Sequence, residues 1–393
     1  MINHPLKVNC LDLLFYGNKS KIVIVGAGLA GLTAAIHLSK LGYTIIIIEK
    51  NSFPKHKVCG EYVSNEVIPY LQWLGIDVES LNPSNIDNLH FSTRNGKSIK
   101  AKLPMGGFGL SRYAFDLLLY QKALENKCEI LQETVDSIDF KDDKFSVYLT
   151  NNTIITADFV LGAFGKRSNL DQKLGRNFIQ KKSPWLAVKG HYKANFPSDL
   201  VGLHHFDGGY CGISKVENDV VNICYLASYS TFKKYEGIVD YESSVLSKNP
   251  FLKEILEKVT PIFDKPLTIS QISFDKKKPI EQHILMIGDS AGLIHPLCGN
   301  GMAMAINSAK IASNLLDDYF QNTILSRKEL EAQYTQKWNQ NFKNRLQTGR
   351  ILGGILQHSK LSEMLLQVLI AFPFLLPLII RNTHGKQILP TKS

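Results

Sequence analysis

The sequence has few cysteines, and they follow no pattern. Its 393 residues include six, with no Cys-x-x-Cys pair and no cysteine and histidine spacing typical of a zinc site. The sequence therefore predicts neither a disulfide framework nor a metal centre, and it favours a reducing compartment such as the cytoplasm. Residues 1–20 contain an apolar stretch too short for a signal peptide, so we interpret them as an N-terminal extension.

Dense basic runs are also absent, although lysine and arginine outnumber the acidic residues by 45 to 35 and give a net charge of +10. Because the basic residues are spread along the chain without interleaved aromatics, nucleic acid is not an expected partner. The positive charge still suits smaller anionic partners, such as nucleotides or anionic lipid. Charged residues at 20% and aromatic residues at 10% are typical of a folded globular protein.

The first motif has the order strand, glycine-rich turn, helix, strand and acid. The first strand is predicted at 21–25, the glycine-rich turn at 26–31 and the helix up to residue 41. The second strand is predicted at 44–48, and the acid is Glu49. This order is typical of a dinucleotide-binding βαβ unit. Gly26 permits the tight turn, Gly28 lets the backbone approach a pyrophosphate, and Gly31 keeps the helix close to the sheet.

The same motif supplies further candidate ligands for a dinucleotide. Leu29 and Ala30 begin the helix, whose N-terminal dipole favours a bound anion. Glu49 is spaced to accept hydrogen bonds from both ribose hydroxyls, and Lys50 directly follows it. We therefore expect the pyrophosphate and ribose of a dinucleotide at this turn.

A second motif lies far downstream and indicates which dinucleotide is bound. Residues 283–287 predict another buried strand, followed directly by Gly288 and Asp289. A glycine-rich segment then leads into a helix predicted from Met302 to about residue 319. A Gly-Asp pair at a strand end, followed by a glycine-rich approach to a helix, is the pattern that holds the ribityl chain and ring of FAD.

On these two motifs the chain resembles, over about residues 21–330, the FAD-dependent oxidoreductases of the p-hydroxybenzoate hydroxylase fold. This group includes aromatic hydroxylases, geranylgeranyl reductases and flavin halogenases. The resemblance implies that Asp289 binds the ribityl hydroxyls. It also implies that the flavin ring is lined by Gly299, Asn300, Gly301 and Met302. In a helix predicted over 111–126, Arg112 is expected to reach the phosphates, and the strand near Val135 is expected to contact adenine.

Departures from the family pattern bear on the chemistry. Phe164 stands where aromatic hydroxylases have an acid, and an apolar ring cannot make that acid's hydrogen bonds. Both NAD(P)H and a partner reductase therefore stay open as electron donors. The segment 57–64, with Cys59 followed by glycine, resembles the Cys-Gly loop of geranylgeranyl reductases. The front half is therefore reductase-like. The aromatic substrate blocks of the reductases and of the halogenases are both missing, so the substrate sheet belongs clearly to neither group.

The predicted fold class is α/β, with a Rossmann-like FAD-binding domain, a mostly antiparallel substrate sheet and a helical C-terminal tail. The predicted boundaries are an extension at 1–20, FAD-binding parts at 21–175 and 279–325, a substrate domain at 176–278 and the tail at 326–393. Candidate pocket residues are Phe206, Tyr210 and Tyr225, although aromatics at strand spacing are also typical of a core. His295 and Cys59 are the candidate proton-transfer residues.

The tail contains an apolar stretch at 364–380, interrupted by Pro373 and Pro377. The two prolines favour a broken helical hairpin over one straight helix. Three interpretations stay open: packing on the substrate domain, peripheral membrane attachment and a true membrane span. The expected location is the cytoplasm, with peripheral membrane contact through this stretch as the alternative.

The predicted function is that of an FAD-dependent oxidoreductase acting on a hydrophobic small molecule. The favoured reaction is hydroxylation of an aromatic or polyene-type substrate by a flavin C4a-hydroperoxide. The alternative is reduction of isoprenoid double bonds, as in geranylgeranyl reductases. A third class, an FAD-fold protein that only escorts lipidated partners, is disfavoured because the flavin-ring motif at 299–301 is intact.

Overall fold

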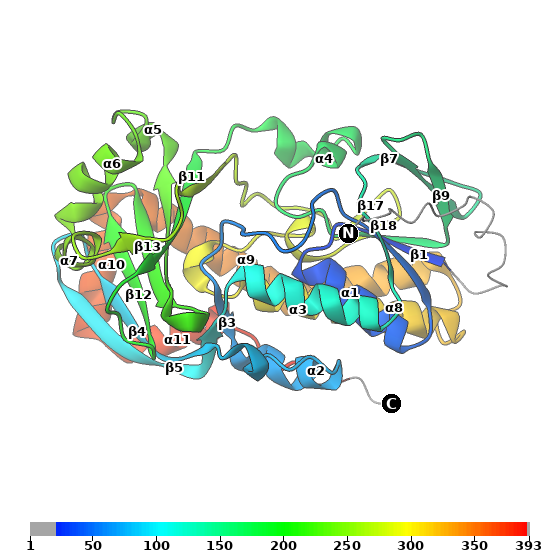
Figure 1. Cartoon of the computed structure of the whole chain (residues 1–393), viewed down its shortest axis with the longest axis horizontal. Coiled ribbons are helices and arrows are strands. Elements are labelled where there is room, and N and C mark those ends of the chain that lie inside the picture. The colour runs from blue at the N-terminus through cyan, green and yellow to red at the C-terminus, as the bar shows by residue number, and fades with distance from the viewer. Residues whose placement is uncertain (1–20, 391–393) are drawn as a thin grey trace, which may run out of the picture.

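Two sheets at opposite ends of the molecule organise the chain (Figure 1). The computed structural model describes residues 21–390, so the predicted extension at 1–20 lies outside the described residues. The six-stranded sheet has the order β17 (Ile280–Glu281), β18 (Ile284–Met286), β10 (Phe159–Gly162), β1 (Lys21–Val25), β2 (Thr44–Ile48) and β6 (Glu129–Leu131). All its pairs are parallel except β17 with β18.

Long helices pack against this sheet and against one another. They are α1 (Leu29–Lys40), α3 (Arg112–Glu125) and α8 (Gly301–Phe320). Because α1 packs against both α3 and α8, ten of its twelve residues are buried. A small antiparallel sheet lies beside them, formed by β7 (Val135–Lys141), β8 (Lys144–Leu149) and β9 (Ile154–Ala157).

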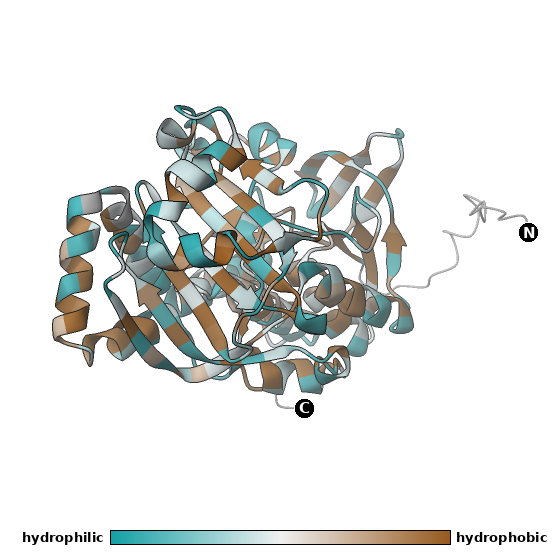
Figure 2. Ribbon diagram, turned by 60° about the vertical axis from the view of Figure 1, so that its left-hand side comes forward, coloured by the Kyte–Doolittle hydropathy of each residue, from teal (hydrophilic) through white to brown (hydrophobic). Residues whose placement is uncertain are grey.

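The nine-stranded sheet forms the other end of the molecule. Its order is β15 (Thr260–Pro261), β11 (Trp185–Lys193), β14 (Val221–Ser228), β13 (Gly209–Lys215), β12 (Leu200–Phe206), β4 (Ser84–Ser92), β5 (Ser98–Gly109) and β3 (Tyr62–Ser64), with β16 (Leu267–Ser270) also paired to β11. Hydrophobic and hydrophilic residues alternate along several of these strands (Figure 2). Successive side chains of a strand point to opposite faces, and each face of this sheet packs against an apolar core of its own.

One face of the large sheet packs on short helices, and the other faces the middle of the molecule. The first face carries Phe206 and Tyr225 against α6 (Ile238–Ser244) and α7 (Pro250–Leu256). The second face carries residues of the opposite parity, including Trp185 and Tyr210. Further short helices are α2 (Ile68–Trp73), α4 (Asn169–Lys173) and α5 (Tyr229–Phe232).

The C-terminal tail is helical and closes the second face of the large sheet. It consists of α9 (Arg327–Gln357), α10 (Ser359–Ala371) and α11 (Leu375–Thr383). The predicted break is present at residues 372–374, where Pro373 lies, and α10 and α11 meet there at a bend of 118°. Both helices pack on the sheet at Leu89, Phe91 and Ile99. Within the described chain no single helix is apolar over a long enough run to cross a bilayer, although this bent pair together passes that test.

The large sheet extends beyond the predicted substrate domain at 176–278. Strands β3, β4 and β5, which the prediction assigned to the FAD-binding part, belong to this sheet. The connection is a parallel pairing of β4 with β12, in which Leu89 lies opposite Val201. Such a pairing between distant segments leaves no local sequence pattern, because each strand shows only its own alternation.

The contact between the glycine-rich turn after β1 and helix α1 gives a first prediction. A Cβ atom on Gly31 would lie 2.0 Å from the carbonyl oxygen of Gly26, where the backbone cannot yield easily. We expect Gly31→Ala to lower the free energy of unfolding by about 3 kcal/mol, as overpacking does. Gly354→Ala, in α9 with nothing within 4 Å of the new Cβ, is the matched control. Thermal unfolding of both variants measures the difference, and equal midpoints would contradict the prediction.

Candidate functional site

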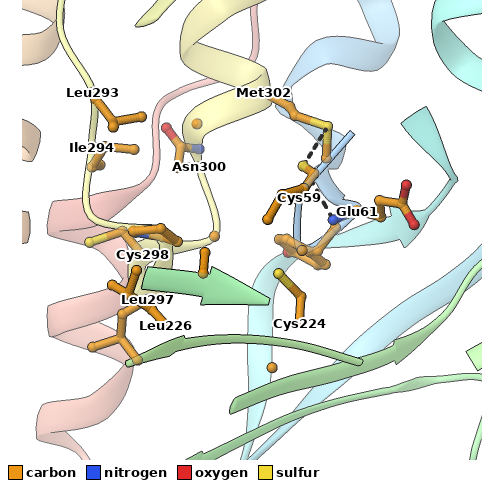
Figure 3. Close-up of a pocket in the computed structure, with 18 of the residues that line it drawn as sticks. Cys59, Glu61, Cys224, Leu226, Leu293, Ile294, Leu297, Cys298, Asn300 and Met302 are labelled. Atoms are coloured by element: carbon orange, nitrogen blue, oxygen red, sulfur yellow. Dashed lines mark hydrogen bonds between the residues drawn. The ribbon is translucent and has the colours of Figure 1, made fainter. Parts of the chain in front are cut away.

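A cavity of about 770 Å³ lies between the two sheets and is lined by residues from both. Figure 3 shows its middle, where residues of the large sheet face residues near the start of α8. One end of the cavity reaches the glycine-rich turn after β1, and the other reaches α10 and α11. The two ends differ in chemistry, because charged side chains gather at the first and aliphatic ones at the second.

The glycine-rich turn has the geometry that the sequence pattern predicts. Gly26 has a φ of +103°, and a Cβ there would lie 2.4 Å from the carbonyl oxygen of Ala163. Gly28 is the N-cap of α1, makes no side-chain cap, and opens onto the cavity with Leu29 and Ala30. The first backbone N–H groups of α1 are therefore available to an anion in the cavity.

Glu49 directly follows β2, and its side chain contacts the glycine-rich turn. Its carboxylate accepts a hydrogen bond from the backbone N–H of Ala27 at 2.9 Å and two from Asn51, at 2.9 Å from the backbone and 2.6 Å from the side chain. These contacts fix the carboxylate at the edge of the cavity, which Glu49 and Lys50 both line. A carboxylate held in this way can accept hydrogen bonds from ribose hydroxyls.

Arg112 lies at the start of α3, with its guanidinium beside the glycine-rich turn. Its guanidinium contacts the Asp116 carboxylate at 2.7 and 2.8 Å, and Lys57 contacts the same carboxylate at 2.7 Å. Burial alone raises the pKa of Asp116, but the charges of Arg112 and Lys57 outweigh this and lower it. One arginine nitrogen lies 3.9 Å from where a Cβ on Gly28 would be. Two cations on one carboxylate leave net positive charge beside the turn, which suits a phosphate.

The second motif lies beside the first, since a Cβ on Gly288 would lie 2.9 Å from the Cβ of Ala30. Gly288 and Asp289 form a 3₁₀ turn after β18, and both line the cavity. Lys277, which the sequence analysis missed, donates a hydrogen bond to the backbone oxygen of Asp289 at 2.8 Å. Burial lowers the pKa of Lys277 to about 8. The Asp289 carboxylate takes no hydrogen bond from the part of the chain that the structure describes, and so remains available to a polyol.

The N-terminus of α8 forms the floor of the middle of the cavity. The residues that line it there are those of the predicted ring-binding segment, Gly299, Asn300, Gly301 and Met302. The side chain of Asn300 is engaged elsewhere, since it donates to Glu66 at 3.2 Å and accepts from Arg345 at 3.1 Å. The helix therefore offers its backbone and its dipole to the cavity, and these favour a partial negative charge.

Two predicted cofactor residues lie away from the cavity wall. Gly31 packs against Gly26 and supports the turn from behind. Val135 begins β7 and is half-buried, and it does not line the cavity. Its predicted contact with adenine stays a prediction.

Cys59 faces the floor of the cavity, as Figure 3 shows. Its Sγ lies 3.9 Å from the Sδ of Met302 and accepts a hydrogen bond from the backbone N–H of Glu61 at 3.5 Å. Two further thiols, Cys224 and Cys298, line the same region, and burial raises the pKa of each to about 12. Cys59 and Cys224 are half-buried, whereas Cys298 is buried.

The aromatic candidates separate by face of the large sheet. Tyr210 lies on the inner face and lines the cavity. Phe206 is fully buried on the outer face and does not line the cavity, which corrects its prediction as a pocket residue. Tyr225 borders the cavity, but its ring packs in the outer core with centroids 6.1 Å from Phe206 and 6.4 Å from Tyr241.

His295 lies behind the cavity wall and does not line it. Its ring packs among Trp185, Tyr210 and Phe274, and neither ring nitrogen has a hydrogen-bond partner among the described residues. Burial lowers the pKa of His295 to about 4. The imidazole is therefore neutral near pH 7, and this geometry does not favour the predicted proton-transfer role.

A buried ion cluster that the sequence analysis missed joins β11 of the large sheet to the start of α3. The Glu61 carboxylate pairs with Lys189 of β11 and with the Nε2 of His191 at 2.7 Å. It also accepts the backbone N–H of Arg112 at 2.7 Å. The lysine in the apolar run of β11 was the available signal, because a fully buried lysine requires a partner.

The far end of the cavity is mainly apolar, and its walls come from strands of the large sheet and from the tail helices. They include Leu103 of β5, Leu203 of β12, Leu366 and Leu369 of α10, and Leu376 and Ile379 of α11. The sequence analysis expected packing of the tail on the substrate domain but did not identify these residues as cavity walls. The spacing of Leu366 and Leu369 on one helical face was the available signal.

Comparison with known proteins agrees with this geometry. A family model described as an FAD binding domain matches residues 19–323. Conditioned medium factor receptor 1 of Dictyostelium discoideum is 23% identical over 362 residues, which cover 82% of this chain and 68% of that protein. A digeranylgeranylglycerophospholipid reductase of Methanococcus aeolicus is 24% identical over 332 residues, covering 82% of each.

Solved structures share the fold at low sequence identity. The flavin-dependent halogenase CmlS superposes with a TM-score of 0.73 and 21% identity, over 85% of this chain and 64% of that one. A geranylgeranyl bacteriochlorophyll reductase-like protein of Thermoplasma acidophilum superposes with a TM-score of 0.71 and 18% identity, over 95% and 94%. The shared fold therefore spans proteins named for different reactions.

The residues at the charged end fit FAD on four counts. An uncapped helix N-terminus at Gly28 suits the pyrophosphate, and Glu49 suits the ribose. The available Asp289 carboxylate suits the ribityl chain, and the floor at α8 suits the ring. When bound there, FAD supplies redox chemistry that the side chains of the cavity do not supply themselves.

Glu49 provides the second prediction. We expect Glu49→Gln to weaken FAD binding about tenfold, because a neutral amide replaces a charged acceptor of ribose hydrogen bonds. Glu254→Gln, an exposed acid in α7, is the matched control. Quenching of flavin fluorescence on titration with the apoprotein measures both dissociation constants. Identical constants for Glu49→Gln and the control would contradict the assignment.

Proposed function

The chain belongs to the FAD-binding domain family, which places it among FAD-dependent oxidoreductases, and we propose that it reduces carbon–carbon double bonds in the prenyl chain of a lipid. The reaction adds a hydride to one alkene carbon and a proton to the other. The sequence analysis favours hydroxylation. The shape and lining of the cavity and the name of one relative favour reduction instead.

The aliphatic end of the cavity is the observation that carries this proposal. It continues directly from the floor at Met302 to α10 and α11, so a chain inside it lies in line with the predicted ring site. Leucine and isoleucine side chains supply contact surface without polar direction, which suits a flexible hydrocarbon. Polar side chains at this end are few, with Ser362, Thr383 and His384 among them, so the lining favours a hydrocarbon over a compact, polar aromatic substrate.

Protein groups at the floor have two tasks in this reaction. The walls around Leu293, Leu297 and Leu226 exclude water from the reacting carbons (Figure 3). Cys59 holds a proton at its Sγ, next to Met302 on the floor, and can deliver it to the alkene carbon that does not receive hydride. The thiol then regains a proton from solvent through the open end of the cavity.

The relatives support the substrate class. The protein from Methanococcus aeolicus is named for reduction of a digeranylgeranylglycerophospholipid, and its similarity extends over most of both chains. Hydroxylation is the second candidate, and the sheltered floor supports it as well, because a water-excluding site protects any oxygenating species. The two reactions differ in their requirement for oxygen, which makes them separable by experiment.

Anaerobic reoxidation of the flavoprotein tests the choice between them. The purified holoprotein is reduced with dithionite and mixed without oxygen with a prenyl lipid dispersed in detergent. We expect the flavin absorbance to return and the lipid mass to rise by two hydrogens per double bond. A saturated lipid is the control, because it offers no double bond. Reoxidation that needs oxygen and adds an oxygen atom to the substrate would replace reduction by hydroxylation.

The thiol of Cys59 gives the fourth prediction. We expect Cys59→Ala to lower the rate of flavin reoxidation by the prenyl lipid about 10²-fold, the scale of a lost general acid. Bound flavin is measured in each variant, and the rate is compared at equal cofactor occupancy. Cys128→Ala, a buried thiol beside α1, is the control. Rapid-mixing absorbance measures the rate, and a wild-type rate in Cys59→Ala would exclude this residue as the proton donor.

A further inference from the structure

The helices α10 and α11 are apolar on two sides, and each side needs a partner. On the inner side Leu366, Leu369 and Ile380 are at least nine-tenths buried against β4 and β5. On the outer side large apolar side chains are exposed to solvent. They are Leu361, Met364, Val368, Phe372, Phe374 and Leu378.

The outer side is unusual within this molecule. The described residues include sixteen exposed large hydrophobic side chains, and six of them lie in the eighteen residues from 361 to 378. Met364 is 64% exposed and Phe374 is 65% exposed, so these are not residues at the rim of a core. A concentration of this kind marks an interaction surface, because isolated exposed apolar residues are otherwise scattered.

The charges around this surface have one dominant sign. Residues 359–390 contain Lys360, Arg381 and Lys386, all exposed, and one acid, Glu363. Glu363 is half-buried and accepts a hydrogen bond from Asn95 at 2.9 Å. On the neighbouring strand β5, Lys100 and Lys102 add two more exposed cations. An apolar surface with a basic border matches an anionic bilayer, whose headgroups lie just above its hydrocarbon.

We propose that α10 and α11 dock in one leaflet of an anionic bilayer, with Met364, Phe372 and Phe374 in the hydrocarbon and the cations among the headgroups. The two helices meet at a bend of 118°, with Pro373 in the break between them, which suits a pair that enters and leaves the same leaflet. A second copy of the chain fits this surface less well, because a two-fold contact would bring the basic borders of both copies together.

The same helices connect the bilayer to the cavity. Leu366, Leu369 and Leu376 line the cavity from the inner side of the helices whose outer side carries the exposed residues. A prenyl lipid in the leaflet therefore needs to pass only this one layer of helix to reach the aliphatic end. This route rests on the proposed function, whereas docking itself does not.

The docking surface is tested by vesicle co-sedimentation of the full-length holoprotein. The test variant carries Met364→Ser, Phe372→Ser and Phe374→Ser, none of which lines the cavity. The matched control carries Ile154→Ser, Val239→Ser and Leu325→Ser, which are exposed apolar residues elsewhere on the molecule. Bound flavin and the thermal midpoint confirm that each variant folds.

We expect the wild type and the control to bind mixed phosphatidylcholine–phosphatidylglycerol vesicles, and the test variant to bind at least tenfold less. Vesicles of phosphatidylcholine alone should bind the wild type more weakly, because the basic border then lacks its anionic partner. Equal binding by the test variant and the control would overturn the proposal. A wild type that is dimeric, becomes monomeric in the test variant and ignores vesicles would replace the bilayer by a second copy.

The route is tested separately from the reaction. Flavin reoxidation is measured with the prenyl lipid in detergent and with the same lipid embedded in the mixed vesicles. We expect the test variant to match the wild type in detergent and to be at least tenfold slower on vesicles. If the wild type fails in detergent, the proposed reduction is wrong while the binding result still stands. If both proteins react equally on vesicles, the route is wrong while the reduction still stands.

Discussion

The junction of α3 with the large sheet depends on one buried carboxylate, that of Glu61. Its backbone has a φ of 56°, a left-handed conformation that a non-glycine residue keeps only where its surroundings enforce it. Burial alone would raise the pKa of Glu61, but the hydrogen bond and charge of His191, with the charge of Lys189, lower it. Removing one partner of such a buried pair costs about 3–5 kcal/mol. The ion cluster therefore fixes how α3, the Cys-Gly loop and β11 meet.

This fixed junction explains the division of the cavity into a charged and an aliphatic end. The loop that carries Glu61 also carries Cys59 and Lys57, so one anchored segment places a thiol on the floor and a cation beside the turn. Beyond the floor, the inner face of the large sheet presents mostly apolar side chains, such as Leu89, Phe91 and Leu203, to α10 and α11. A cofactor with phosphates and a hydrocarbon substrate can thus occupy one continuous space without sharing an environment.

Local sequence patterns were enough to predict the cofactor end. The turn at Gly26 and Gly28 depends on residues adjacent in sequence, and the cap of α3 by Ser111 lies within one turn of its partner Ala114. The ion pair of Glu61 with Lys189 spans 128 residues, and no local pattern encodes it. The same holds for the pairing of β4 with β12, and for which face of the large sheet carries Phe206. Those features depend on the tertiary fold, because the packing of the whole sheet determines which strands pair and which face each side chain occupies.

The apolar stretch of the C-terminal helices has a sequence pattern that several environments can explain. A stretch that is apolar all round fits a core, a membrane surface or a span equally well by composition. In the structure Leu366 and Leu369 on the inner side of the helices pack against the large sheet, whereas the large apolar residues on the outer side stay exposed. Exposed phenylalanines at a helix bend lower solubility unless a binding partner covers them, so their presence indicates an interaction surface. Under the proposed function, a lipid substrate supplies that use, because an enzyme for it must meet the phase in which it dissolves.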